Sequence, residues 1–374
     1  MSIPLDNGLN IKLESNKKTR RGLRKFFKIF FICIACFAFV GVAWAYTYMR
    51  TVPPPEIPPL PTFAEIEPMP NSEEPVIAFG DEEDEEEENW MAAIELVAPE
   101  RFTDEDRKEL FFTFLIVGLN EGRNANTVMV ASYDGVTGEA NLISIPRDSL
   151  LNVNRNFRKL SGSYLVGLLS GCGITQVQRD VMTVIGFVPD FYVVIDYEAF
   201  FAIVDAVGGV EIYVPFHMRN DDPYQDLFID IQPGLHHMDS EMALLFARFR
   251  ESNPGYRPIT DYDRIENQQT VVNAVIDNLF RPSNILRIPD FINIFNESVD
   301  TNLTVQNMVW FASQLPNLNG SEALSSYTMP TDGNSGRPMW YEFLHGPAIV
   351  ELVNKTVNPF ERDIELRDLD IIRN

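Results

Sequence analysis

The stretch "FFTFLIVGLNEGRNANTVMVASYDGVTGEANLISIPRD", residues Phe111 to Asp148, decides the fold of this 374-residue chain. Its opening "FFTFLIVGL" is an almost continuous apolar run with Gly118 near its end, which is typical of a buried strand. The runs "NTVMVASYD" and "EANLISIPR" are rich in strand-forming residues, and the "GVTG" between them indicates a hairpin. The stretch therefore predicts three strands.

A hairpin that turns near Val136 brings polar side chains together at one end of these strands. Asn126 and Asp148 each lie about ten to twelve positions from the turn, so strand geometry places them at the same end. Asn120 ends the first strand and is joined to Asn126 by a short segment. Ligands commonly bind at strand ends of α/β sheets, so these three positions are candidate site residues. Alternatively, all three are solvated turn residues that bind no ligand.

The segments that follow alternate between helical and strand patterns, which predicts one α/β domain. Helices are expected at residues 175–185, 197–207, 240–248 and about 263–280, and strands at 191–196 and 210–215. Thr175 is the expected N-cap of the first helix, and Gly186 is its expected stop. The acidic stretch 220–234 is expected to be a solvated loop, and residues 281–374 a mostly helical extension packed on the same domain.

The N-terminal region has the pattern of a membrane anchor. Residues 17–28 are strongly basic, and the apolar run that follows reaches the roughly 20 residues that a helix needs to cross a bilayer. The distribution of Lys and Arg predicts a cytoplasmic tail over residues 1–28, a transmembrane helix over 29–48 and an extracellular position for the rest. A cleaved signal peptide is the alternative, because Ala43-Trp44-Ala45 resembles a cleavage site.

Residues 51–100 are expected to form a disordered extracellular linker. Its "PPPEIPPLP" favours extended polyproline geometry, and the acidic run at residues 81–88 repels itself and buries no apolar area. The whole chain has a net charge of -24, which argues against binding nucleic acid through a general positive field. An anionic ligand must therefore be held by a local cluster of Arg and Lys.

Two later segments supply side chains of this kind. Arg248 and Arg250, in "ARFR", face the same way if the chain is extended there. Two guanidinium groups beside a helix end suit a phosphate or pyrophosphate, because each can donate two parallel hydrogen bonds. Arg264 and Gln268 are four positions apart on a predicted helix and therefore lie on one face. Surface arginines paired with nearby acids are the alternative.

Four blocks, "SIPRDS", "DAVGGVEIYVP", "ARFR" and "DYDRIENQQ", resemble in order and spacing the LytR–CpsA–Psr family of cell-wall glycopolymer transferases. The resemblance covers roughly residues 111–280 of a domain expected at 101–280, and the short cytoplasmic tail and single anchor fit it. It implies a three-layer α/β/α domain with a central mixed sheet, outside a bacterial cell of the Gram-positive type. It also implies transfer of a glycan-1-phosphate polymer from a polyprenyl diphosphate carrier to peptidoglycan, as in the attachment of teichoic acid or capsule.

The resemblance further implies roles for the residues at matching positions. The pyrophosphate would be held by Arg147, Lys159, Arg248, Arg250, Arg264 and Gln268. The catalytic residues would be Arg147, Asp148, Arg248 and Arg250. Asp148 would be one of the acids around Mg²⁺ or Mn²⁺, a cofactor that suits phosphoryl transfer because it neutralises charge on positioned oxygens.

Asn120 and Asn126 depart from the family pattern, which has aspartate at position 126 and commonly at position 120. As metal ligands they would offer an amide oxygen without the negative charge. Two alternatives therefore stay open beside the transferase. One is a catalytically weakened family member that binds polyprenyl (pyro)phosphate as a scaffold or regulator. The other is a hydrolase of the polyprenyl-diphosphate-linked pyrophosphate.

Overall fold

The computed structural model describes residues 51–59, 106–120, 123–155, 157–223, 227–279, 281, 284, 287–314, 324–335 and 340–372. The chain divides into two units, Met1–Val52 and Pro53–Asn374, and the elements below belong to the second. The transmembrane helix predicted at residues 29–48 lies outside the described residues. Within the described residues, no helix is both long enough and apolar enough to span a bilayer.

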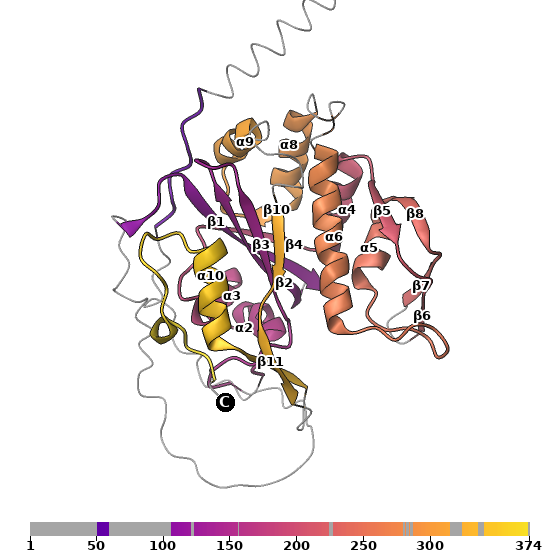
Figure 1. Ribbon diagram of the computed structural model, residues 1–374. Coiled ribbons are helices and arrows are strands. Elements are labelled where there is room, and N and C mark those ends of the chain that lie inside the picture. The colour runs from indigo at the N-terminus through magenta and orange to yellow at the C-terminus, as the bar shows by residue number, and fades with distance from the viewer. Residues whose placement is uncertain are drawn as a thin grey trace, which may run out of the picture. The chain divides into compact units, whose positions relative to one another are not determined.

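A six-stranded mixed sheet forms the centre of this unit, in the order β10-β3-β2-β1-β4-β9 (Figure 1). Its strands are β1 (Phe111–Asn120), β2 (Asn124–Asp134), β3 (Ala140–Ile145), β4 (Phe191–Ile195), β9 (Asp300–Thr301) and β10 (Leu324–Thr328). The first three are antiparallel neighbours, and the opening stretch predicts these three strands and the hairpin between the second and the third. Strands β4 and β10 join them in parallel, which makes the sheet mixed.

The register of β2 and β3 sets the geometry at the end of this sheet. Val128 pairs with Ile145, so Asn126 and Arg147 lie opposite one another just beyond that pair. Asn120 ends β1 in the tight connection to β2. The predicted convergence of these polar positions follows directly from this register.

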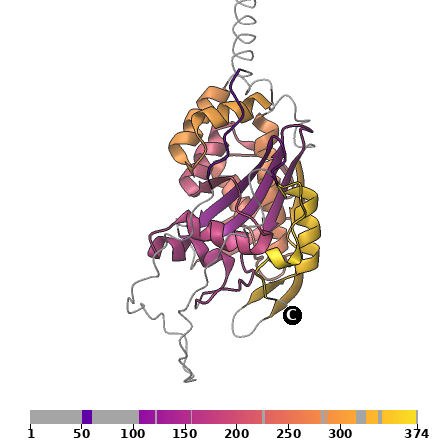
Figure 2. The ribbon, with the colours of Figure 1, turned by 90° about the vertical axis from the view of Figure 1, so that its left-hand side faces the viewer.

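Helices cover both faces of the sheet, which gives three layers (Figures 1 and 2). One face carries α2 (Ser163–Leu169), α3 (Ile174–Ile185) and α10 (Gly346–Thr356), and the other carries α4 (Tyr197–Ala206), α6 (Asp261–Leu279), α8 (Ile288–Ser298) and α9 (Val305–Gln314). Side chains of β1 alternate between the two faces, as strand geometry requires. Leu115 and Val117 pack with α3 and α10, whereas Ile116 packs with α4, α6 and α8.

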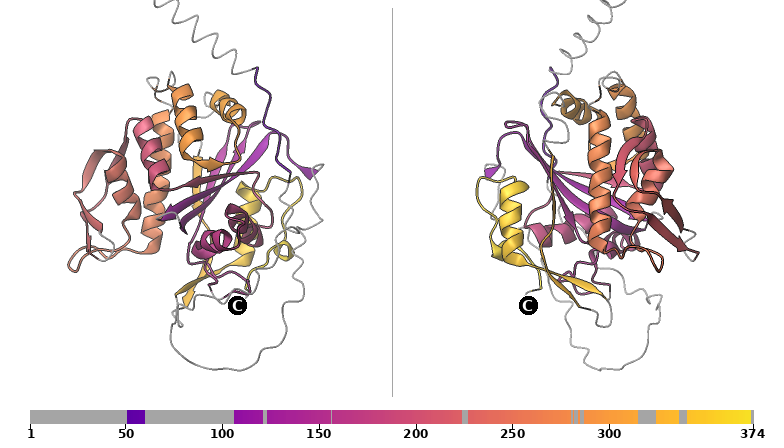
Figure 3. Two further views of the ribbon diagram at one scale, coloured as in Figure 1. Left: turned by 180° about the vertical axis from the view of Figure 1, so that it is seen from behind. Right: turned by 45° about the vertical axis from the view of Figure 1, so that its right-hand side comes forward.

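The helix and strands that lie beside α4 and α6 (Figure 3) hold a second apolar cluster. It contains α5 (Ser240–Arg248) and two strand pairs, β5 (Val210–Val214) with β8 (Gly234–Met238) and β6 (Met218–Asp222) with β7 (Leu227–Ile231). The expectation of a solvated loop over residues 220–234 is therefore wrong. Every second side chain of β7 is buried, and this alternation stabilises a strand even though the exposed Asp230 lies between two of the buried residues.

Helix ends agree with the sequence in most places. Helix α5 has the predicted bounds, and α3 stops at Gly186, whose φ of 85° suits glycine. The N-cap of α3 is Gly173 rather than Thr175, because the helix already begins at Ile174. Helix α6 begins at Asp261, two residues before the expected start.

The chain beyond Arg281 contributes strands as well as helices. Besides α8, α9 and α10 it contains β9, β10, and the paired strands β11 (Thr331–Ser335) and β12 (Tyr341–Leu344). The mostly helical pattern expected for residues 281–374 did not include these strands. Strand β10 completes the central sheet against β3, and Ile349 and Val353 of α10 are fully buried in its core.

Candidate functional site

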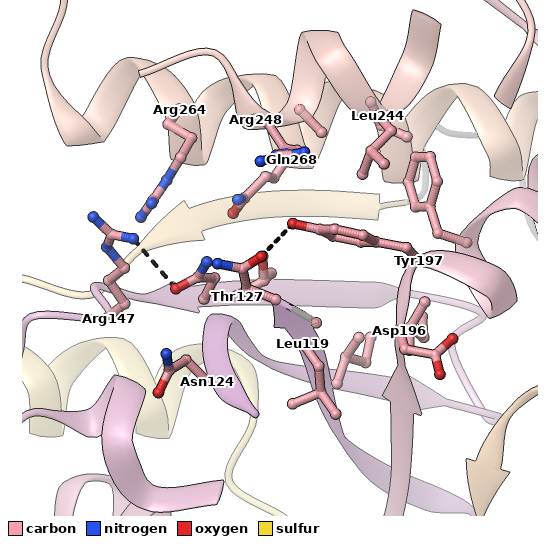
Figure 4. Close-up of a pocket in the computed structure, with 18 of the residues that line it drawn as sticks. Leu119, Asn124, Thr127, Arg147, Asp196, Tyr197, Leu244, Arg248, Arg264 and Gln268 are labelled. Atoms are coloured by element: carbon pink, nitrogen blue, oxygen red, sulfur yellow. Dashed lines mark hydrogen bonds between the residues drawn. The ribbon is translucent and has the colours of Figure 1, made fainter. Parts of the chain in front are cut away.

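A cavity of about 330 Å³ lies where α4, α5 and α6 approach the ends of β1, β2 and β4 (Figure 4). Its polar lining consists of Asn120, Asn124, Asn126, Thr127, Arg147, Asp196, Tyr197, Arg248, Arg250, Arg264 and Gln268. Its apolar lining consists of Ile116, Leu119, Met129, Ile195, Phe200, Leu227, Leu244, Ala247, Val271 and Val272. The cavity is thus lined by polar side chains, mainly guanidinium and amide groups, and by apolar side chains.

The structure brings together all the site residues that the sequence predicts. Seven of them line the cavity, namely Asn120, Asn126, Arg147, Arg248, Arg250, Arg264 and Gln268. Asp148 and Lys159 are not part of the lining but lie beside it. The Lys159 Nζ is 2.9 Å from Oδ1 of Asp148, whose Oδ2 is 3.9 Å from Nε of Arg147. The predicted acid is therefore already in an ion pair.

Arg248 and Arg250 reach the cavity together because the helix ends between them. Arg248 is the last residue of α5, and Phe249 has an extended backbone with ψ of 114°. Phe249 is fully buried and fixes this exit of the chain. Arg264 and Gln268 enter the same cavity from α6, where their spacing places them on one face.

Asp261 is a site residue that sequence reasoning missed. Its Oδ2 is 2.8 Å from Nη2 of Arg264, and its Oδ1 is 3.9 Å from Nε of Arg147. It stands three positions before Arg264 in the "DYDRIENQQ" block, and this spacing on a helix was an available signal. The carboxylate therefore joins two of the four arginines.

Arg264 is the most buried cation of the group, with 3% of its surface exposed. Burial lowers the pKa of Arg264 to about 10; the charge of Asp261 opposes this shift, while the neighbouring cations Arg147 and Arg250 add to it. The side chain is still charged at neutral pH. An anion in the cavity would relieve the repulsion among these guanidinium groups.

Tyr197 is the second residue that the sequence did not reveal. Its hydroxyl donates a hydrogen bond of 2.6 Å to Oδ1 of Asn120, and its ring lies under the Arg248 guanidinium at 5.2 Å. No local pattern marks this tyrosine, because its role depends on how α4 and α5 pack. Asn126 makes a comparable contact, since its Oδ1 accepts a hydrogen bond of 3.2 Å from Nη1 of Arg147 (Figure 4).

The donor groups described at this end of the sheet do not fit a divalent cation. Magnesium prefers carboxylate oxygens together with the oxygens of a phosphate substrate. The amide oxygens of Asn120 and Asn126 face hydrogen-bond donors, and Asp148 faces Lys159. Across the described ranges, no three His, Cys, Asp or Glu side chains gather in a way that could hold a metal ion. The site is instead rich in cations.

Comparison with known proteins gives one family. The model of the LytR_cpsA_psr family matches residues 82–358. The chain is 26% identical over 212 residues to the polyisoprenyl-teichoic acid–peptidoglycan teichoic acid transferase TagV of Bacillus subtilis, covering 54% of this chain and 52% of that relative. It is 26% identical over 242 residues to the TagU transferase of Bacillus mycoides, covering 64% and 73%. The chain thus spans about half the length of TagV.

Solved structures share the fold at low identity. The crystal structure of Bacillus subtilis TagV has a TM-score of 0.55 at 22% identity and covers 71% of this chain and 100% of that one. A structure of TagT bound to LIIa-WTA has a TM-score of 0.51 at 19% identity and covers 69% and 93%. These likenesses concern the mixed α/β architecture and its central sheet.

Proposed function

Since this chain belongs to the LytR_cpsA_psr family, we propose that it is a phosphotransferase that attaches a glycan-1-phosphate polymer from a polyprenyl diphosphate carrier to peptidoglycan. The names of TagV and TagU describe transferases of this kind, which supports the assignment. The observation that carries it is the composition of the cavity. Four guanidinium groups gather at one part of a lining whose remainder is largely apolar.

The two parts of the cavity match the two parts of the proposed donor. Arginine binds phosphate oxygens through two parallel N–H donors, and four such groups suit a diphosphate better than a single phosphate. The apolar side chains suit a prenyl chain, whose burial is favourable in proportion to the area removed from water. The head group would lie against Arg147, Arg248, Arg250, Arg264 and Gln268.

The proposed reaction is a phosphoryl transfer. An acceptor hydroxyl oxygen of peptidoglycan attacks the phosphorus that carries the glycan, and a new P–O bond forms. The bond from that phosphorus to the bridging oxygen breaks, and polyprenyl phosphate leaves with the electron pair. The hydroxyl proton passes to a carboxylate, for which Asp148 and Asp261 are placed beside Arg147. The guanidinium groups neutralise the charge that develops on the phosphoryl oxygens.

The predicted anchor would locate the proposed reaction at the outer side of the cell membrane. We propose that the helix at residues 29–48 holds the protein in the cell membrane, with the tail at 1–28 in the cytoplasm and the catalytic domain outside. The basic run before the apolar segment supports this orientation. The linker at residues 51–100 would let the cavity reach both the carrier lipid and the peptidoglycan.

The test is transfer of a labelled saccharide from a polyprenyl diphosphate carrier to purified peptidoglycan by the full chain. We expect label in the peptidoglycan with the wild type and loss of most of it with Arg248→Ala. Equal incorporation by the two proteins, or none by either, would overturn the proposal.

A second candidate function is favoured by Asn120 and Asn126, which stand where the family pattern has acids. A weakened family member would bind the carrier lipid without transferring its glycan. Binding of a prenyl diphosphate without turnover in the same assay would identify this case. Release of a phosphorylated saccharide in the absence of peptidoglycan would identify the hydrolase instead.

A further inference from the structure

We propose that this cavity holds a diphosphate without a divalent cation, and that Asn120 and Asn126 position two of its arginines by accepting hydrogen bonds. The inference rests on the proposed function, because the diphosphate concerned is that of the donor lipid. It differs from the metal-bound arrangement that the family resemblance implies. Three features of the site carry it.

The first feature is the direction of the Asn126 amide. Its Oδ1, the atom that would face a metal ion, accepts a hydrogen bond of 3.2 Å from Nη1 of Arg147. A divalent cation on the same oxygen would lie next to a guanidinium group and be repelled by it. The amide oxygen instead holds Arg147 at the end of β3, where its guanidinium lines the cavity.

The second feature is the connection from Asn120 to Arg248. The Oδ1 of Asn120 accepts a hydrogen bond of 2.6 Å from the Tyr197 hydroxyl, and the Tyr197 ring supports the Arg248 guanidinium at 5.2 Å. A cation is held over an aromatic face by the ring quadrupole. Asn120 is therefore a positioning residue that acts on Arg248 through Tyr197.

The third feature is the balance of charge. The two carboxylates beside Arg147 each pair with a cation, Asp148 with Lys159 at 2.9 Å and Asp261 with Arg264 at 2.8 Å. Asp196 adds a third carboxylate in the cavity lining. The four arginines and Lys159 therefore leave the described cluster with an excess of two positive charges to offer an anion. Aspartates at positions 120 and 126 would cancel that excess, and a divalent cation would then be needed to restore it. Asparagines leave it in place.

The experiment is a calorimetric titration of the full chain in detergent with geranylgeranyl diphosphate, in EDTA and then in magnesium. We expect the wild type to bind as tightly in EDTA as in magnesium, or more tightly, because free magnesium competes for the ligand. Asn126→Asp should instead bind the diphosphate more tightly in magnesium than in EDTA. Its affinity in EDTA should fall by about tenfold, because the new carboxylate neutralises Arg147, and magnesium should restore it.

The matched control is Asn124→Asp. Asn124 lines the same cavity and pairs with Asn120 across the β1–β2 connection, so the substitution adds the same charge to the same rim. Its amide lies apart from the Arg147–Asn126 contact in Figure 4. We expect this variant to lose less affinity in EDTA and to respond more weakly to magnesium than Asn126→Asp does, because its carboxylate lies apart from Arg147. A requirement as strong as that of Asn126→Asp would overturn the role assigned to Asn126.

A spectroscopic readout separates metal binding from ligand binding. In electron paramagnetic resonance without diphosphate, the Asn120→Asp, Asn126→Asp double variant should bind one more Mn²⁺ than the wild type, whose acidic run at residues 81–88 is common to both proteins. Near-ultraviolet circular dichroism would confirm that each variant is folded. If the double variant is not folded, the single Asn120→Asp variant takes its place in the Mn²⁺ measurement. Equal Mn²⁺ binding by the wild type and the double variant, or wild-type diphosphate binding that needs magnesium, would overturn this inference. Failure to bind diphosphate under either condition would overturn the proposed function itself.

Discussion

The Arg248 guanidinium stacks over the ring of Tyr197, with its Cζ 5.2 Å from the ring centroid. The contact joins the last residue of α5 to the first residue of α4, so two helices fix one cation of the cavity between them. The ring and the hydroxyl of Tyr197 have different partners, which allows their contributions to be separated by substitution.

Tyr197→Phe should weaken binding of inorganic pyrophosphate less than Tyr197→Ala does. The phenylalanine keeps the aromatic face under Arg248 and loses the hydrogen bond to Asn120, which is worth about threefold to tenfold in affinity. The alanine loses the ring as well. Calorimetric dissociation constants for the two variants check this order, and equal losses would show that the ring does not support Arg248.

Arg250→Ala should weaken pyrophosphate binding by roughly tenfold to a hundredfold, the range expected for hydrogen bonds to a charged group. Arg250→Lys should recover only part of the loss, because an ammonium group keeps the charge without the planar fork. Arg367→Ala is the matched control, since Arg367 pairs with Glu365 at 3.0 Å and its side chain is 68% exposed. A Lys variant that binds as well as the wild type would argue against bidentate contacts.

Leu244→Trp should reduce the affinity for geranylgeranyl diphosphate and leave the affinity for inorganic pyrophosphate nearly unchanged. Leu244 belongs to the apolar lining, so a larger side chain occupies space assigned to the prenyl chain. The control is Leu169→Trp, because Leu169 is 70% exposed on α2. Equal losses for both ligands would place the prenyl chain elsewhere.

Thr260→Ala should destabilise the domain by about 1 kcal/mol at neutral pH, because Thr260 and Asp263 cap the start of α6. The Asp263 carboxylate accepts hydrogen bonds from the backbone N–H and the hydroxyl of Thr260 at 2.6 and 2.7 Å. Burial alone would raise the pKa of Asp263, but these hydrogen bonds and the charge of Arg257 together lower it below 3.8.

The pH dependence of this effect has a definite sign. A carboxyl whose folded pKa is depressed contributes stability above its unfolded pKa and loses that contribution as pH falls through the folded value. The difference between wild type and Thr260→Ala in urea unfolding should therefore be full at neutral pH and shrink below the ordinary value of 3.8. Thr260→Ser keeps the hydroxyl and should behave like the wild type. A difference that is constant with pH would contradict the cap.

The central hairpin could be predicted because its signals are local. Alternation and the Gly-containing turn between β2 and β3 fix the register, and the register alone places Asn126 opposite Arg147. The bounds of α5 and the stop of α3 at Gly186 follow from residues at the helix ends. The family resemblance inferred from four short blocks is confirmed by the match over residues 82–358.

Other features depend on partners that are distant in the sequence. Strand β10 pairs with β3 across more than half of the domain, and its five residues carry no distinctive pattern. Tyr197 and Asp261 join the site only because α4 and α6 pack against the same end of the sheet. The amide direction of Asn120 and Asn126 is likewise set by their neighbours, so the sequence showed a missing charge but not the hydrogen bonds that replace it.

The most direct test of the central claim is a crystal structure with geranylgeranyl diphosphate grown in manganese, with anomalous scattering to locate the metal. We expect both phosphorus atoms among the guanidinium groups of Arg147, Arg248, Arg250 and Arg264, the prenyl chain along the apolar lining, and no anomalous peak at Asn126. A head group bound outside this cluster would contradict the proposed function. A manganese ion between Oδ1 of Asn126 and the diphosphate would contradict the metal-free arrangement.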